Sequence, residues 1–81
     1  MAPDAGPSLL DLRGTPCPLN YVRSRLALEK LPPGAVLLVD LDRGEPERMV
    51  AEGLAEAGHR VEVLEEGAAP PGAVRLRLHR G

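Results

Sequence analysis

The sequence predicts an α+β fold, in which two helices cover one face of a four-stranded mixed sheet to form a two-layer sandwich. Two observations support this prediction. Nine glycines and nine prolines divide the 81 residues into short segments, and apolar residues recur within those segments at either strand or helix spacing. The segments follow the order β-α-β-α-β-β. The first strand–helix–strand unit should therefore cross over with a right hand.

The first half of the chain predicts a strand, a helix and a central strand. Residues 9–13 are apolar-rich and are followed by a glycine, which is typical of a short strand. Residues 19–31 contain neither glycine nor proline and are mostly good helix formers, with Pro18 expected at the first helical position. Residues 35–41 form a near-continuous apolar run, which indicates a strand covered on at least one face.

The second half predicts another helix and two more strands. A helix is expected from Pro46 to about Ala57, because proline suits its first position and Gly58 supplies the left-handed conformation that commonly ends a helix. Residues 59–65 and 73–79 then alternate between apolar and charged side chains. This period of two predicts half-exposed strands that form an antiparallel pair.

The first helix presents apolar side chains on two arcs. One arc runs the full length of the helix and is expected to pack against the sheet; it consists of Tyr21, Ser24, Leu28 and Leu31. The other arc consists of Leu19, Val22 and Leu26. This second arc is either part of a wide buried face or a surface on which a partner protein docks.

Composition limits the classes of function. Tyr21 is the single aromatic residue, so the core is expected to consist of Leu, Val and Ala with a contribution from Met49. A surface site is then more plausible than a deep aromatic pocket. The net charge of −2 argues against a dedicated nucleic-acid binder. No apolar run approaches the ~18 residues of a membrane span.

The N-terminal residues lack the basic region and apolar segment of a secretory signal. We therefore expect a disordered lead at residues 1–8, a single domain at residues 9–81 and a cytoplasmic location.

Cysteine and histidine usage excludes several kinds of site. A single cysteine, Cys17, rules out an intramolecular disulfide and a dithiol redox motif. The two histidines, His59 and His79, have no second ligand at metal-binding spacing. We expect neither a structural metal nor a cofactor.

Cys17 is the strongest candidate for chemistry. It lies between Pro16 and Pro18, where the N-cap of the first helix is expected, and backbone N–H groups at a helix start together with the helix dipole favour an anion. A thiol there is stabilised as the reactive thiolate, and a persulfide anion would be favoured likewise. The prediction places His59 at the far end of the second helix, so no general base completes a hydrolase site. The alternative is a buried, inert structural cysteine.

Other polar residues receive more ordinary interpretations. Asp42 is expected to cap the turn before the second helix, although the topology also places it near the start of the first helix. Arg75, Arg77 and Arg80 are expected to form an exposed strand face, because no aromatic residues accompany them for RNA binding.

The chain resembles the TusA/SirA/YedF-like sulfur-carrier family. The motifs that carry the resemblance are the segment Leu10-Asp11-Leu12-Arg13-Gly14-Thr15-Pro16-Cys17-Pro18, then Leu28 and Leu31, Pro33-Gly34, Asp42, and Gly58-His59. The resemblance implies a fold similar to the C-terminal domain of translation initiation factor three. It also implies that Cys17 accepts persulfide sulfur from a cysteine desulfurase or rhodanese-like donor and passes it to a downstream acceptor protein. Family outlets include tRNA thiolation, sulfur oxidation and molybdenum-enzyme maturation.

Two positions depart from the family pattern. Asn20 replaces the second proline of the usual Cys-Pro-x-Pro motif, and Arg43 replaces the second residue of the usual Asp-Asp pair. We expect Pro16, Pro18 and Asn20 to support the thiolate or persulfide. The residues expected to dock partners are Arg13, Arg23, Arg25 and Asp42. Neither departure touches Cys17, so the sulfur-carrier interpretation stands while the assignment to tRNA thiolation weakens.

A different class of function stays open. In this alternative the chain is a regulatory or protein-interaction module in which Cys17 is not catalytic, and the second arc of the first helix is its working surface. Such a protein would show an ordinary thiol pKa near 8.5. The carrier, in contrast, would act stoichiometrically within a sulfur relay.

Overall fold

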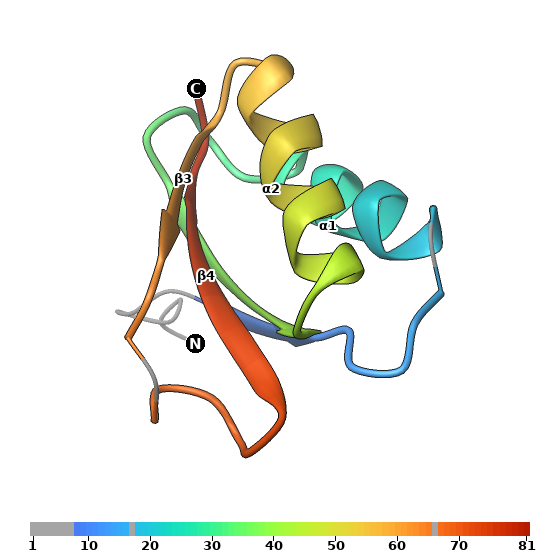
Figure 1. The fold of residues 1–81 in the computed structure, drawn as a ribbon. Coiled ribbons are helices and arrows are strands. Elements are labelled where there is room, and N and C mark those ends of the chain that lie inside the picture. The colour runs from blue at the N-terminus through green and yellow to red at the C-terminus, as the bar shows by residue number, and fades with distance from the viewer. Residues whose placement is uncertain (1–7, 17, 66) are drawn as a thin grey trace.

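A computed structural model describes residues 8–16, 18–65 and 67–81, and it confirms the predicted sandwich (Figure 1). The elements, in chain order, are β1 (Ser8–Asp11), α1 (Leu19–Glu29), β2 (Val36–Asp42), α2 (Glu45–Glu56), β3 (Arg60–Val63) and β4 (Ala73–His79). The sheet order is β1-β2-β4-β3. β1 and β2 are parallel, and β4 pairs antiparallel with both β2 and β3. Both helices lie on one face of the sheet.

Several boundaries differ from prediction by one to two residues. β1 begins at Ser8, inside the expected lead, and ends at Asp11, although the Leu12 amide still donates to the Asp40 carbonyl at 2.9 Å. α1 ends at Glu29, because the residue before a proline disfavours helical geometry and Pro32 follows closely. β3 is confined to Arg60–Val63. Residues 1–7 of the expected lead lie outside the described residues.

The core lies between the helices and the sheet and is aliphatic, as predicted. Its buried members are Leu12, Leu28, Leu37, Val39, Leu41, Val50, Leu54, Val74, Leu76 and Leu78. Met49 was expected to contribute, but it is 48 % exposed. α2 buries a narrow face centred on Val50 and Leu54, and a turn of 100° per residue points Met49 away from it.

α1 buries one arc and exposes the other. Its buried residues are Asn20, Ser24 and Leu28, and the buried Ser24 hydroxyl is satisfied because it donates to the Asn20 carbonyl at 2.8 Å. The opposite arc is open, with exposed fractions of 48 % for Leu19, 41 % for Val22 and 57 % for Leu26. The interpretation as a wide buried face is therefore wrong. The alternative, a surface stripe, describes this arc.

Candidate functional site

The loop between β1 and α1 leads to Cys17, which itself lies outside the described residues. A turn forms at the start of this loop, where the Thr15 amide donates to the Leu12 carbonyl at 3.1 Å. Gly14 lies inside the turn with φ of 77°, a left-handed conformation that glycine adopts without strain. The geometry of the residues before Cys17 is thus set by a closed turn.

The N-terminus of α1 differs slightly from the prediction. Pro18 is the N-cap and provides no side-chain cap, and Leu19 is the first helical residue. Pro18 was expected one position further in, so Cys17 precedes the N-cap in sequence. The helical hydrogen-bond pattern begins before Leu19, because the Asn20 backbone amide donates to the Pro16 carbonyl at 3.2 Å. Both flanking prolines therefore belong to the entry of the helix.

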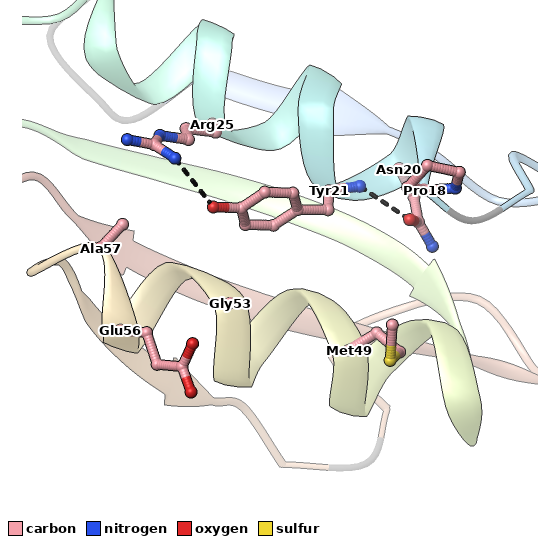
Figure 2. Close-up of a pocket in the computed structure, with 8 residues that line it drawn as sticks. All are labelled: Pro18, Asn20, Tyr21, Arg25, Met49, Gly53, Glu56 and Ala57. Carbon is pink, nitrogen blue, oxygen red and sulfur yellow. Dashed lines mark hydrogen bonds between the residues drawn. The ribbon is translucent and has the colours of Figure 1, made fainter.

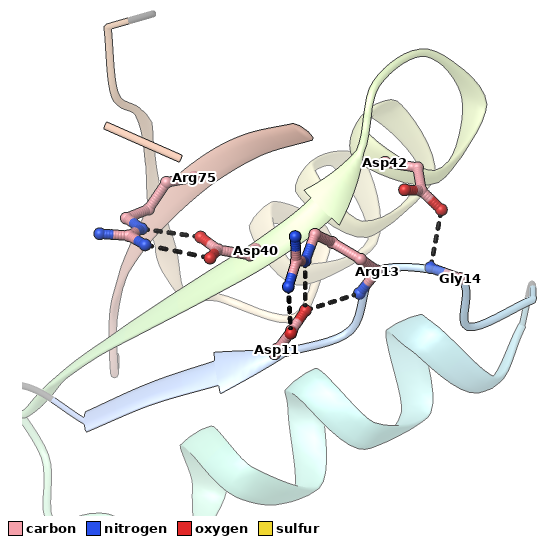
Figure 3. A network of polar contacts seen from close by, with 6 residues as sticks. All are labelled: Asp11, Arg13, Gly14, Asp40, Asp42 and Arg75. Atoms are coloured by element: carbon pink, nitrogen blue, oxygen red, sulfur yellow. Dashed lines mark hydrogen bonds and ion pairs between the residues drawn. The ribbon is translucent and has the colours of Figure 1, made fainter. Parts of the chain in front are cut away.

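Asp42 supports the loop rather than the second helix. Its Oδ2 accepts a hydrogen bond of 2.8 Å from the Gly14 amide, across 28 residues of sequence (Figure 3). The N-cap of α2 is Gly44, whose amide donates to Glu47 Oε1 at 3.4 Å. Asp42 was expected to cap the turn before the second helix, but its carboxylate instead binds the loop that leads to the first helix.

Two arginine–carboxylate pairs lie beside this contact on the open face of the sheet. Arg13 binds Asp11 with both Nε and Nη2, at 2.9 and 2.8 Å. Arg75 binds Asp40 with Nε and Nη2, at 2.7 and 3.0 Å. Asp40 is only 3 % exposed. The prediction of an exposed arginine face is wrong for Arg75, which is committed to a buried carboxylate.

The Arg13 contact shifts the titration of Asp11. Hydrogen bonds from the Arg13 side chain and backbone lower the pKa of Asp11 from its ordinary 3.8 to about 2. The contribution of this Arg13–Asp11 contact to the free energy of unfolding is present above the ordinary pKa of Asp11 and is lost as the pH falls from about 4 to about 2. Replacing Arg13 with Gln should return the pKa of Asp11 toward 3.8, measured by NMR titration of the Asp11 carboxyl carbon. Arg77→Gln should leave it unchanged, and an equal shift in both variants would contradict the assignment.

A groove of about 520 Å³ lies between α1 and α2 (Figure 2). The residues that line it are Pro18, Asn20, Tyr21, Arg25, Met49, Gly53, Glu56 and Ala57. Pro18, Asn20 and Met49 lie at one end, and Arg25, Glu56 and Ala57 at the other. The groove therefore starts beside Pro18, the residue that follows Cys17. Tyr21 is its single aromatic residue.

Gly53 makes room for the Tyr21 ring in this groove. A Cβ atom at Gly53 would lie 2.6 Å from Tyr21 Cε1, well inside contact distance. No motif in the sequence includes Gly53, although a glycine in the middle of a helix costs about 1 kcal/mol relative to alanine. A glycine kept at such a position indicates that another group packs closely against the helix there, so the contact with Gly53 was predictable from the sequence.

Replacing Gly53 with Ala should push the Tyr21 ring out of the groove. Tyr21 is the single aromatic residue, so the near-ultraviolet circular dichroism of the protein reports this ring alone, and we expect most of that signal to disappear. Ala55→Ser, on the exposed face of α2, is the matched control. An unchanged spectrum for Gly53→Ala would show that the ring does not rest on α2.

Asn20 and Arg25, two predicted site residues, are held within α1. The Asn20 side chain is fully buried, and its Oδ1 accepts a hydrogen bond of 2.7 Å from the Tyr21 amide. Arg25 donates to the Tyr21 hydroxyl at 3.1 Å and to Glu29 Oε2 at 2.9 Å. These bonds, that to Glu29 first, raise the pKa of Arg25. Arg23 lies instead on the exposed side of the helix.

His59 lies at the end of α1 that is remote from the Cys17 loop, as predicted. It is buried, and its Nε2 lies 3.2 Å from Glu29 Oε2 at the end of α1. The Gly81 amide donates to Nδ1 at 3.1 Å, so Nδ1 is the acceptor and Nε2 carries the proton. An 11-residue helix is about 16 Å long, which separates this contact from the start of α1. His59 links α1 to the C-terminus.

Within the described ranges, no cluster of three or more His, Cys, Asp or Glu side chains has the arrangement of a metal site. In those same ranges, neither helix has the length and apolar character needed to cross a membrane.

Comparison with known proteins gives one consistent result. Residues 8–80 match the family described as "Sulfurtransferase TusA". The chain is 33 % identical over 58 residues to a "Putative sulfur carrier protein" of Archaeoglobus fulgidus, covering 72 % of this chain and 66 % of that protein. It is 35 % identical over 57 residues to a protein of the same description from Thermotoga maritima, covering 70 % and 72 %. The aligned region is thus just under two thirds of the Archaeoglobus relative.

A solved structure supports the fold independently. The crystal structure of a SirA-like protein from Desulfitobacterium hafniense superposes with a TM-score of 0.77 at 24 % identity, over 91 % of this chain and 97 % of that one. At this identity the likeness concerns the fold alone. The family is shown by the match over nearly the whole chain: this chain belongs to the TusA sulfurtransferase family.

Proposed function

We propose that this sulfur carrier holds sulfane sulfur as a persulfide on Cys17 and relays it to an acceptor protein. The Cys17 thiolate attacks the outer sulfur of a donor persulfide. A new S–S bond forms at Cys17, the S–S bond of the donor breaks, and the donor cysteine leaves as a thiolate. Delivery to the acceptor repeats the exchange in reverse, so the relay has no net oxidant or reductant.

The observation that carries this proposal is the different charge at the two helix starts. α2 has Glu45 and Glu47 in its first turn, which satisfy the positive end of the helix. α1 has no acidic residue in its first turn and no side-chain cap. The positive end of α1 is thus left for an anion supplied from outside the helix, and the preceding cysteine is suited to supply a thiolate or persulfide.

The neighbours of Cys17 have supporting roles in this proposal. Pro16 and Pro18 restrict the backbone on either side of the sulfur. Asn20 holds the first turn of α1 through its bond to the Tyr21 amide. This stiff setting would keep the sulfur in place, so that a partner protein meets it in one geometry. We place the relay in the cytoplasm, with tRNA thiolation as one of its candidate outlets.

A single experiment tests the carrier chemistry. The protein is incubated with a cysteine desulfurase and cysteine and then weighed intact by mass spectrometry. We expect a gain of one sulfur atom that a thiol reductant removes. Because Cys17 is the single cysteine, this gain assigns the persulfide to it. No added sulfur, or added sulfur that the reductant leaves in place, would refute the proposal.

The donor and acceptor proteins are proposed to dock on the exposed stripe of α1. Leu19, Val22 and Leu26 form its apolar part, and Arg23 and Lys30 fall on the same arc at 100° per residue. Both cations are exposed. Arg13, Arg25 and Asp42, which were also expected to dock partners, are engaged within the chain. The stripe therefore fits a partner surface with an apolar centre and a carboxylate border.

Reversing the two charges of this stripe should slow docking but leave the chemistry intact. For the double variant Arg23→Glu/Lys30→Glu we expect loading from a persulfidated cysteine desulfurase to slow about tenfold. Loading from a small-molecule polysulfide should proceed at the wild-type rate. Arg60→Glu, at an exposed position on β3, is the matched control. Equal loss with both sulfur sources would argue against a docking role.

The exposed stripe also favours a second candidate, an interaction module in which Cys17 is not catalytic. That function predicts that Cys17 alkylation follows a pKa near 8.5. The carrier predicts a lower value, because the helix start stabilises the thiolate. The pH profile of alkylation distinguishes the two.

A further inference from the structure

We infer that Asp42 is a positioning residue of the sulfur-carrying site, which its carboxylate serves by holding the Gly14 amide in the loop that leads to Cys17. This inference rests on the proposed function for the role of Cys17. The Asp42–Gly14 contact itself is independent of that function.

Sheet register brings the two residues together. β1 and β2 are parallel, and Asp11 pairs with Asp40 at their carboxyl ends. Asp42 is the last residue of β2 and lies two residues beyond that pair. It is therefore beside the segment that follows β1. The resulting 2.8 Å bond from the Gly14 amide to Asp42 Oδ2 joins positions 28 residues apart. No local propensity of the loop would produce this contact.

The two carboxylates near Asp42 are each paired with an arginine, whereas Asp42 binds the backbone of the loop. Three carboxylates, Asp11, Asp40 and Asp42, gather at the ends of β1 and β2. Arg13 takes the first in a two-point contact, and Arg75 takes the second. The carboxylate of Asp42 accepts from the backbone. Because Asp42 binds a backbone amide, its contact fixes the position of the loop. The Arg13–Asp11 and Arg75–Asp40 ion pairs connect side chains.

Gly14 is a suitable point at which to hold the loop. Its φ of 77° reverses the chain, and the turn closes with the Thr15 amide on the Leu12 carbonyl. A Cβ atom at Gly14 would meet nothing within 4 Å, so the glycine is required by its backbone angle and not by crowding. One hydrogen bond at this residue therefore orients the segment Thr15-Pro16 that immediately precedes Cys17.

Two variants separate the hydrogen bond from the charge. Asp42→Asn and Asp42→Ala both remove the negative charge, but only asparagine keeps an acceptor oxygen at the same place. The readouts are hydrogen exchange at the Gly14 amide and the pH profile of Cys17 alkylation by iodoacetamide. Glu52→Ala, an exposed carboxylate on α2, controls for general charge removal.

For Asp42→Ala we expect Gly14 amide exchange to accelerate about tenfold and the alkylation profile to move to higher pH, with about tenfold slower alkylation at neutral pH. Asp42→Asn should restore both to within about threefold of wild type. Glu52→Ala should match wild type. A merely structural role would alter stability without moving the alkylation profile, so unfolding midpoints are measured in parallel.

Two results would overturn the inference. One is an Asp42→Ala protein with wild-type Gly14 exchange and a wild-type alkylation profile. The other is an Asp42→Asn protein as impaired as Asp42→Ala, which would assign the effect to charge. Neither readout uses a persulfide. If wild-type protein takes up no sulfur while Asp42→Ala still changes both readouts, the positioning role stands and the proposed function fails.

Discussion

Replacing Cys17 with alanine or serine is expected to abolish sulfur transfer completely. The sequence contains no second cysteine, so no other side chain can form the new S–S bond. Serine keeps nearly the size of the thiol but offers a hydroxyl that is not ionised at neutral pH. The measurement is the passage of radiolabelled sulfur from a loaded desulfurase, through this chain, to an acceptor thiol.

The comparison of the two Cys17 variants serves as an internal control. Both should bind the donor with wild-type affinity, because docking is assigned to the exposed stripe of α1. Their unfolding midpoints show whether the loop tolerates the change. Transfer of labelled sulfur at a measurable rate by either variant would favour the interaction module over the carrier.

Replacing Arg75 with alanine should give the largest loss of stability among surface substitutions in this protein. Asp40 is 3 % exposed, and the two-point contact with Arg75, at 2.7 and 3.0 Å, compensates its carboxylate. The same contact raises the pKa of Arg75. Removing one partner of such a pair leaves a charge in a poorly hydrated place. We expect the thermal midpoint to fall by about 10 °C, measured by calorimetry.

The neighbouring Arg77 is the matched control for this substitution. It follows Arg75 by two residues on β4, and therefore lies on the same face of the sheet. Its side chain is exposed, and its ion pair with Glu62 is longer, with 3.6 Å between Arg77 Nη1 and Glu62 Oε1. Arg77→Ala should change the midpoint by less than about 3 °C. The double variant Asp40→Ala/Arg75→Ala should be more stable than the sum of its single changes predicts. Strict additivity would show that the pair is not coupled.

Turns and element order were readable from the sequence because they depend on local chemistry. Gly14 and Gly58 have positive φ, and glycine tolerates that conformation better than any other residue. Pro46 lies in the first turn of α2, where its missing N–H costs nothing. Strand alternation in 73–79 predicted the buried Val74, Leu76 and Leu78 correctly. Boundaries shifted by one to two residues, since helix ends depend on small energy differences.

Side-chain partners were not readable in the same way. From its nearest neighbours, Asp42 was expected to cap the turn before the second helix. Arg75 was expected on an exposed face because it alternates with apolar residues. Each instead binds a group far along the chain, at 28 and 35 residues of separation. Met49 had helical spacing but fell outside the narrow buried face of α2. A pattern in the sequence specifies which face of a helix or strand a residue occupies, but not which distant side chain or backbone group it contacts.

By itself, the sequence determined the fold class, the family resemblance and Cys17 as the candidate for sulfur chemistry. All three rest on local signals: residue periodicity, turn residues and a motif of contiguous residues. Only the tertiary structure decided that Asp42 binds the loop before Cys17, that Tyr21 rests over Gly53 in a groove, and that one arc of α1 is exposed. These features depend on the register of β1 with β2 and on the packing of α1 against α2, which arise only when distant segments meet.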